Sequence, residues 1–183
     1  KGLDLKGGIN VILQISIKDI LKGLAENTRN ITFNNSLEEA DNIQKNSDEP
    51  YIESFFQAFD NIKGLQKLSD PQIFGNRTLS DEINFEMEDN QTQNVIRRKI
   101  DESIVSAFEV LRKRIDKFGV TQPNIQRLGT SGRILVELPG AKDVERIKSL
   151  LQSTAQLEFW ETFKNDKLIG FLLEANDLIK KNN

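Results

Sequence analysis

The chain offers few side chains that could carry out chemistry. It contains no Cys and no His, which removes thiol nucleophiles, disulfides, imidazole bases and zinc sites of the common Cys/His kind. The remaining candidates are carboxylates in or beside expected strands, namely Asp4, Glu137, Glu158 and Glu161. Paired carboxylates can act as acid and base, but the spacing singles out no pair here. We therefore predict a protein that is not an enzyme, with no catalytic residue, metal site or cofactor.

A glycine pair, Gly7 and Gly8, is the second candidate for chemistry, because glycine-rich turns can bind phosphate. A phosphate loop leads from a strand into a helix, whose N-terminal amides bind the anion. Here the order is reversed, since the glycines precede an alternating apolar run at residues 10–17. We therefore interpret the pair as a bend at the entry of a strand, where glycine supplies a positive φ or allows close packing.

Composition limits the partners of the chain. Its 183 residues suffice for one domain, or for one domain with a large insertion. The formal net charge of -3 leaves no basic excess, so nucleic acid is not an expected partner. No apolar run approaches the roughly 20 residues that span a bilayer. The first residue is Lys1 and the last residues are polar, so we expect a piece of a longer protein whose membrane segments are absent here.

The elements that must position any site begin with the strand at residues 10–17. Residues 18–90 have a different character, because two apolar stripes at helical spacing are separated by Asn-rich polar segments. The stripes are Ile20, Leu21 and Leu24, and Tyr51, Phe55, Phe56 and Phe59. We predict short helices joined by polar loops.

The second half of the chain contains the clearest periodicity. Apolar residues at three- and four-residue steps predict a long helix that ends near Phe118, with Gly119 suited to its C′ position. A hairpin follows at residues 124–139, then a helix capped by Asp143, then a strand at residues 155–162. The order, apart from the insertion, is strand, helix, strand, strand, helix, strand.

This order predicts an α+β fold of the ferredoxin-like (βαββαβ) type, an antiparallel sheet with helices on one face. A mostly helical insertion separates the first strand from the first long helix. We expect residues 1–17 and 91–162 to form the base domain and residues 18–90 the inserted subdomain. Residues 163–183 are an extension.

Several stretches together resemble the SecD and SecDF proteins of bacterial protein export. They are "GLDLKGG" before the first strand, "LRKRIDKFGVTQPNIQRLG", "GRILVELPGAKDVERIKSLL" and "TAQLEFWET". The resemblance covers residues 1–17 and about 95–162 and implies the base of the first periplasmic domain, with the extension leading toward a mobile head. Its glycine motif, with a structural role, consists of Gly2, Leu3, Asp4, Leu5, Lys6, Gly7 and Gly8.

What the resemblance implies is a role in translocation on the periplasmic side of the bacterial inner membrane. The family assists proton-gradient-driven export of preproteins through the SecYEG channel. The implied partners are unfolded preprotein, SecYEG, and SecF or the SecF half of a fusion. The membrane is contacted only through segments that this chain does not include.

Three residues are candidates for contact with polypeptide on the sheet face away from the helices. Trp160 is the sole Trp and is expected on that face, where an exposed aromatic can dock an unfolded chain. The alternative is that the inserted segment, or residues outside this chain, cover it. Gln14 and Glu137 are predicted to share the face. Two alternatives stay open. The domain could be a rigid support for the head, or a ferredoxin-like domain that binds a small ligand or hydrolyses an acyl phosphate, with Arg or Lys and Asn converging near the first helix.

Overall fold

The computed structural model describes residues 8–117, 119–120, 122–141, 143, 145–151 and 174–176. The chain divides into two compact units. Unit 1 comprises Lys1–Ser16 and Ser103–Asn183, and unit 2 comprises Ile17–Glu102. In the described part of the chain, no helix combines the length and the apolar character needed to cross a bilayer.

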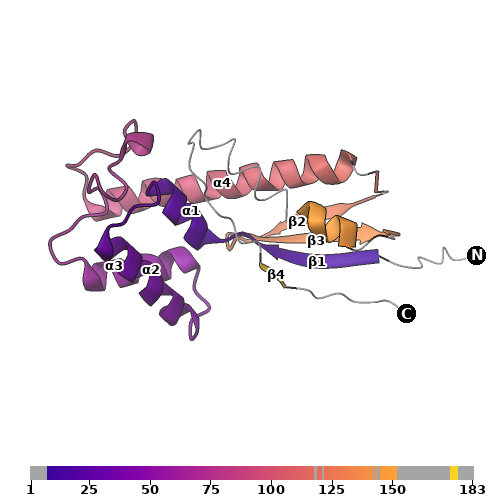
Figure 1. Ribbon diagram of the computed structural model, residues 1–183, viewed down its shortest axis with the longest axis horizontal. Helices are drawn as coiled ribbons and strands as arrows, with labels where there is room; N and C mark the ends of the chain where they lie inside the picture. Colours follow the sequence, from indigo (N-terminus) through magenta and orange to yellow (C-terminus); the bar gives the residue numbers. More distant parts are fainter. Residues whose placement is uncertain are drawn as a thin grey trace, which may run out of the picture. The chain divides into compact units, whose positions relative to one another are not determined.

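Unit 1 contains an antiparallel sheet of four strands in the order β2-β3-β1-β4 (Figure 1). β1 spans Gly8–Gln14, β2 spans Asn124–Leu128 and β3 spans Arg133–Pro139. The short β4, Glu174–Asn176, pairs with the end of β1. β2 and β3 form the predicted hairpin, and two glycines with positive φ, Gly129 and Gly132, lie in its turn. Glycine adopts this conformation without the steric cost that other residues have.

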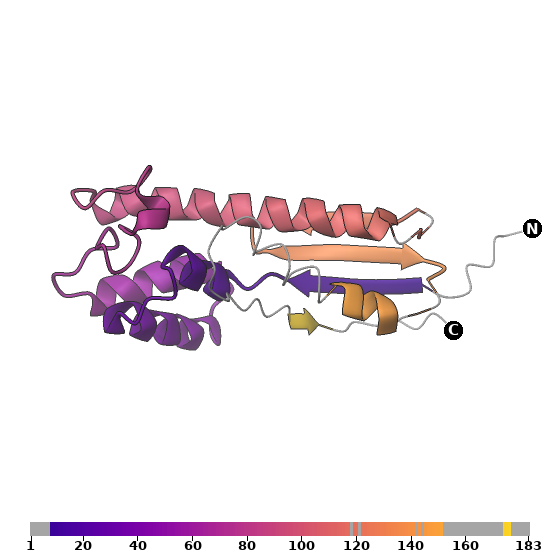
Figure 2. The same cartoon turned by 45° about the horizontal axis from the view of Figure 1, so that its top comes forward.

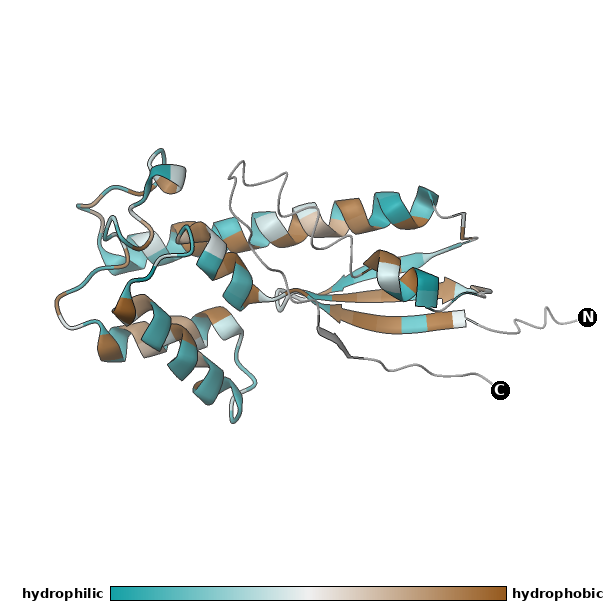
Figure 3. Ribbon diagram, viewed as in Figure 1, coloured by the Kyte–Doolittle hydropathy of each residue, from teal (hydrophilic) through white to brown (hydrophobic). Residues whose placement is uncertain are grey.

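Alternation of side chains gives the sheet one buried face. Every second residue of β1 and β3 is buried, and in the paired register Val11 lies opposite Val136 and Leu13 opposite Ile134. Figure 3 shows both strands as largely hydrophobic. The period of two in the sequence is therefore the direct cause of the one-sided core.

Two helical segments pack apolar side chains against the buried face of the sheet in unit 1. α4 spans Asp89–Lys117, and its part from Ser103 onward belongs to this unit, as does the helical segment 145–151. Both lie along the sheet in Figure 2. Their buried side chains are Ile104, Leu111, Ile115, Ile147 and Leu151. The two helices thus share one hydrophobic core with β1 and β3.

Both helix ends predicted for this unit are confirmed. Gly119 follows α4 with a φ of 73°, and its N–H donates to the carbonyl of Asp116 at 3.3 Å. Asp143 caps the segment 145–151, because its Oδ1 accepts a hydrogen bond from the N–H of Arg146 at 3.1 Å.

The structure supports a mixed helix and sheet fold with an antiparallel sheet, and the ferredoxin-like arrangement stays a prediction. The expected last strand at residues 155–162 lies outside the described residues. The first strand also ends earlier than predicted, at Gln14 instead of Ile17. Ile15 still donates its N–H to the carbonyl of Gly132 at 2.9 Å, and Ile17 begins the next helix.

Unit 2 is helical, as predicted for the insertion. It contains α1 (Ile17–Leu24), α2 (Ile31–Gln44), α3 (Tyr51–Ile62), the 3₁₀ helix η1 (Arg77–Leu79) and the first half of α4. Both predicted stripes are confirmed as buried, apart from the partly exposed Tyr51. Phe55 lies at the centre of an aromatic cluster, with ring centroids 5.6 Å from Phe33 and 6.4 Å from Phe74.

The prediction that the Asn-rich stretch after residue 26 is a loop is wrong for residues 31–44, which form α2. Asn30 explains why a helix begins here, since its Oδ1 accepts from the N–H of Phe33 at 2.9 Å. Phe33, Leu37 and Ala40 follow at helical spacing and are all buried. The many Asn residues concealed a three-residue apolar stripe.

Polar side chains tie the remaining loops of unit 2 to its helices. The buried Asn76 donates to the carbonyls of Leu24 and Ile73 at 2.7 and 2.8 Å. On α4, Arg97 forms a two-pronged ion pair with Glu53 at 2.8 and 2.9 Å. The hydrogen bonds from Arg97 hold the pKa of the Glu53 carboxyl below its usual value.

Candidate functional site

The sheet face opposite the core of unit 1 carries a row of polar side chains across three strands. The register places Asn10 of β1, Glu137 of β3 and Asn124 of β2 side by side. Asn10 donates to one carboxylate oxygen of Glu137 at 3.3 Å, and Asn124 donates to the other at 2.6 Å. The carboxylate is therefore held by two amides and is only half-buried.

The next row on this face combines polar and apolar side chains. Ile12 lies beside Leu135 and Gln126, so this row combines half-buried aliphatic groups with an exposed amide. Such a mixture of hydrogen-bonding groups and apolar surface suits contact with polypeptide better than it suits a reaction.

Gln14 lies at the end of this face, and its side-chain amide forms hydrogen bonds within the protein. Its Nε2 donates to the carbonyl of Ser131 at 2.8 Å and to the carbonyl of Ile15 at 3.0 Å. These bonds connect the end of β1 to the hairpin turn. The structure thus places Gln14 and Glu137 on one face, as predicted. The side chain of Gln14 also holds the hairpin turn against the end of β1.

Other predicted residues lie outside the described part of the chain. These are Gly2, Leu3, Asp4, Leu5, Lys6, Gly7, Glu158, Trp160 and Glu161. Gly8 is described as the first residue of β1, opposite Pro139. An added Cβ at Gly8 would lie 3.5 Å from the carbonyl oxygen of Leu138, an ordinary contact. The bend expected at the glycine pair stays a prediction, because Gly7 lies outside the described residues.

Unit 2 holds an open groove that the sequence did not predict. It has a volume of about 630 Å³ and lies between the end of α1, the start of α2 and the loop near Pro71. Arg29 is the one cationic residue that lines it, while the carboxylate of Glu26 accepts from Thr78 at 2.6 Å. Asn30 and Asn76 also line the groove, but both side chains are engaged in the bonds described above. The groove thus lacks the convergent basic set expected of an acyl-phosphate site.

Acidic side chains do not form a metal centre in the described residues. No group of three or more carboxylates there is close enough to hold a metal ion.

Comparisons with known proteins give this fold a family. Residues 104–163 match the family described as protein translocase subunit SecDF, P1 domain, N-terminal. The chain is 35% identical over 86% of its length to protein translocase subunit SecD of Rhodothermus marinus, covering 24% of that protein. It is 34% identical to SecD of Acetobacter pasteurianus and 34% identical to SecD of Aquifex aeolicus. These two matches each cover 86% of the chain, and 31% and 30% of the respective relatives. No solved structure matches the chain significantly.

The chain is thus part of a protein translocase subunit. Within that class it belongs to the SecD family and carries that family's first (P1) domain. It spans about a quarter to a third of the length of these relatives. The descriptions of the relatives name a translocase subunit and no catalytic activity.

Proposed function

We propose that unit 1 is the periplasmic base of a SecD subunit and contacts the polypeptide that emerges during export. Unit 2 is then the inserted subdomain, and the strand at residues 155–162 completes a ferredoxin-like base. The family membership supports the translocation role. The observation that carries the contact is the row Asn10–Glu137–Asn124, which leaves a half-exposed carboxylate and amides on the sheet face away from the core.

An extended chain can use such a face in two ways. Its backbone amides can donate to the Glu137 carboxylate, and its apolar side chains can lie against Ile12 and Leu135 in the next row. The edge of β2 offers a further route, because in the described sheet β2 has a neighbour only in β3 and strand addition is a common mode of peptide binding.

The wider role follows from the family and belongs to the same proposal. The full-length subunit acts at the bacterial inner membrane with the SecYEG channel and SecF, and it uses the proton gradient to complete export of preproteins. Residues that carry protons lie in membrane segments outside this chain.

Site-specific crosslinking tests the contact. This chain contains no Cys, and a single Cys can be introduced at Gln126, Glu137 or Trp160 in a full-length protein from which any other Cys has been removed, while a preprotein is being exported. We expect adducts with the preprotein from these positions. Glu145 is exposed on the helical segment that packs on the other face, and Cys at this position serves as the control. Equal yields from Glu137 and Glu145, or no adducts, would show that unit 1 is a rigid support.

A further inference from the structure

A short loop in unit 2 presents an aromatic side chain to solvent. Residues 84–88 connect the buried Ile83 to Asp89, the first residue of α4. Within this loop Phe85 is 64% exposed, whereas Phe33, Phe55, Phe59 and Phe74 of the same unit are fully buried. Burying an aromatic ring ordinarily stabilises a fold. Phe85 lacks most of this burial.

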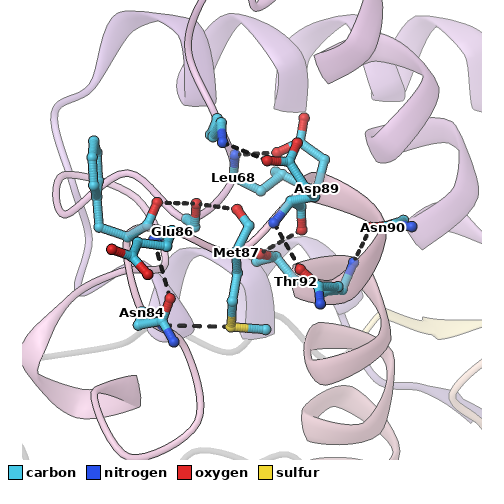
Figure 4. Close-up of polar contacts among 12 residues, drawn as sticks. Leu68, Asn84, Glu86, Met87, Asp89, Asn90 and Thr92 are labelled. Atoms are coloured by element: carbon cyan, nitrogen blue, oxygen red, sulfur yellow. Dashed lines mark hydrogen bonds and ion pairs between the residues drawn. The ribbon is translucent and has the colours of Figure 1, made fainter.

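Hydrogen bonds fix the backbone on both sides of Phe85. The Oδ1 of Asn84 accepts from the N–H of Glu86 at 3.1 Å, and the N–H of Met87 donates to the carbonyl of Asn84 at 3.1 Å. The hydroxyl of the fully buried Ser69 donates to the carbonyl of Met87 at 2.8 Å (Figure 4). The ring is therefore carried on a preorganised turn.

The loop is also anchored to the start of α4. Asp89 accepts from the N–H of Leu68 at 2.7 Å, and the N–H of Glu88 donates to the side chain of Gln91 at 3.0 Å. Figure 4 shows these contacts converging where the loop enters the helix. Because the backbone that carries Phe85 is already ordered, binding costs little loop entropy, which favours the use of this residue as an anchor.

Several carboxylate residues lie within four positions of Phe85 in the sequence. Asp81 and Glu86 are exposed and form no ion pair with any described residue. Glu88 pairs with Lys67, but its side chain is still 71% exposed. The local charge is negative, so an anionic lipid surface would repel it. A complementary partner surface must be basic.

We propose that Phe85 is the anchor by which unit 2 docks a folded protein whose surface has an apolar pocket rimmed by Lys or Arg. A single ring on a fixed, convex turn needs a preformed concave pocket, which an unfolded chain does not have. Aromatic side chains that fill such pockets contribute much of the binding energy of an interface, and the flanking carboxylates steer the encounter. This docking goes beyond the proposed contact with unfolded polypeptide and involves the other unit.

Photocrosslinking from position 85 of the full-length protein in native membranes tests this proposal. We expect one adduct of discrete mass, whose yield falls about ten-fold in Glu86→Lys. Mass spectrometry then identifies the partner pocket, and changing one of its basic residues to Glu should restore the adduct with Glu86→Lys. Leu65 is also exposed but has the uncharged neighbours Gly64 and Gln66. The same photoreactive group at position 65 is the matched control and should give no such adduct.

Every other result overturns the docking proposal. Adducts of heterogeneous mass that require preprotein synthesis indicate an unfolded chain, and adducts with lipid indicate the membrane surface. Absence of an adduct, or a yield unaffected by Glu86→Lys, shows that the loop is not an anchor. Phe85→Ala should leave the melting temperature unchanged, which separates lost binding from lost folding. The Glu137 adducts of unit 1 report separately on the proposed function.

Discussion

Asp89 Oδ1 accepts a hydrogen bond from the backbone N–H of the fully buried Leu68 at 2.7 Å. Its other oxygen lies 2.6 Å from the Nζ of Lys63, and the Asp89 side chain is only 15% exposed. One carboxylate at the N-terminus of α4 therefore satisfies a buried backbone donor and a cation, in a position that also suits the helix dipole.

Replacing this carboxylate should loosen the whole 63–88 loop. We expect Asp89→Ala to lower the free energy of unfolding by about 2 kcal/mol, because it leaves the Leu68 N–H without its acceptor. Asp89→Asn keeps an acceptor oxygen and should lower the free energy of unfolding by about half as much as Asp89→Ala. The exposed Asp81 provides the control, and Asp81→Ala should stay within about 0.5 kcal/mol. Urea unfolding of the three variants measures the differences, and equal losses for Asp81 and Asp89 would contradict this role.

Gly75 is a second point at which the 63–88 loop depends on one residue. A Cβ added there would lie 2.1 Å from the carbonyl oxygen of Ser69, which is backbone and cannot rotate away. We expect Gly75→Ala to lower the free energy of unfolding by about 3 kcal/mol or more. Gly8→Ala is the matched control, because its nearest neighbour is at 3.5 Å. A small effect at both positions would show that the loop adapts.

The two glycines also show what the sequence could and could not predict. Period-two and helical spacing predicted β1, the β2–β3 hairpin, α1, α3 and α4, because each of these buries a regular stripe. Gly75 was not predicted to be essential, since its need arises from the backbone of Ser69, six residues away. The same limit applies to Phe85, because the loop that exposes it is held by bonds that no local pattern reveals. In these bonds Asn84 accepts from Glu86 and Met87, and Ser69 donates to Met87.

For the candidate site, the sequence predicted the face but not its bonding. Alternation placed Gln14 and Glu137 on the same side of the sheet. The partners of Glu137 depend on the register of β1 and β2 with β3, and a shift of one residue would move them to the other face. Asn10 and Asn124 were therefore missed, although both are short amides at the predicted strand positions.

The ion pair of Glu53 with Arg97 should contribute to stability in a defined pH range. Because the folded pKa of Glu53 is lowered by the hydrogen bonds from Arg97, its contribution is present above the unfolded value of about 4.3 and is lost as the pH falls through the folded value. Both side chains are more than a third exposed, so we expect Glu53→Gln to cost only about 0.5 kcal/mol at pH 7.

Urea unfolding of wild type and Glu53→Gln from pH 7 to pH 3 measures this difference. The difference should shrink as the pH falls below the unfolded value of about 4.3. It should vanish only below the lowered folded pKa, where the carboxylate is protonated in both states. Glu49→Gln is a suitable control, because Glu49 is exposed and forms no ion pair with the described residues. A cost for Glu53→Gln that does not depend on pH would mean that packing, not charge, explains the effect.

Tyr51 provides a test at the opposite end of the pH scale. Its hydroxyl lies 3.0 Å from both the carbonyl of Leu37 and the carboxylate of Asp41. Burial and the Asp41 charge raise the pKa of the Tyr51 phenol well above its usual value. Because it is the sole Tyr of the chain, the phenolate absorption reports on it alone. We expect no phenolate in the folded protein near pH 10, and about half ionisation at that pH after unfolding in urea.

The same pKa shift determines how Tyr51 affects stability. A raised folded pKa gives a contribution that is complete below the unfolded value of about 10 and is lost above it, by about 1.4 kcal/mol per pH unit. We expect Tyr51→Phe to cost about 1 kcal/mol at pH 7, through the lost hydrogen bonds. The difference in the free energy of unfolding between wild type and Tyr51→Phe should then disappear within about one pH unit above pH 10. Comparing the two proteins cancels the titration of the lysines, which they share. An advantage that persists at pH 11, or phenolate that forms in the folded state near pH 10, would contradict the buried environment of Tyr51.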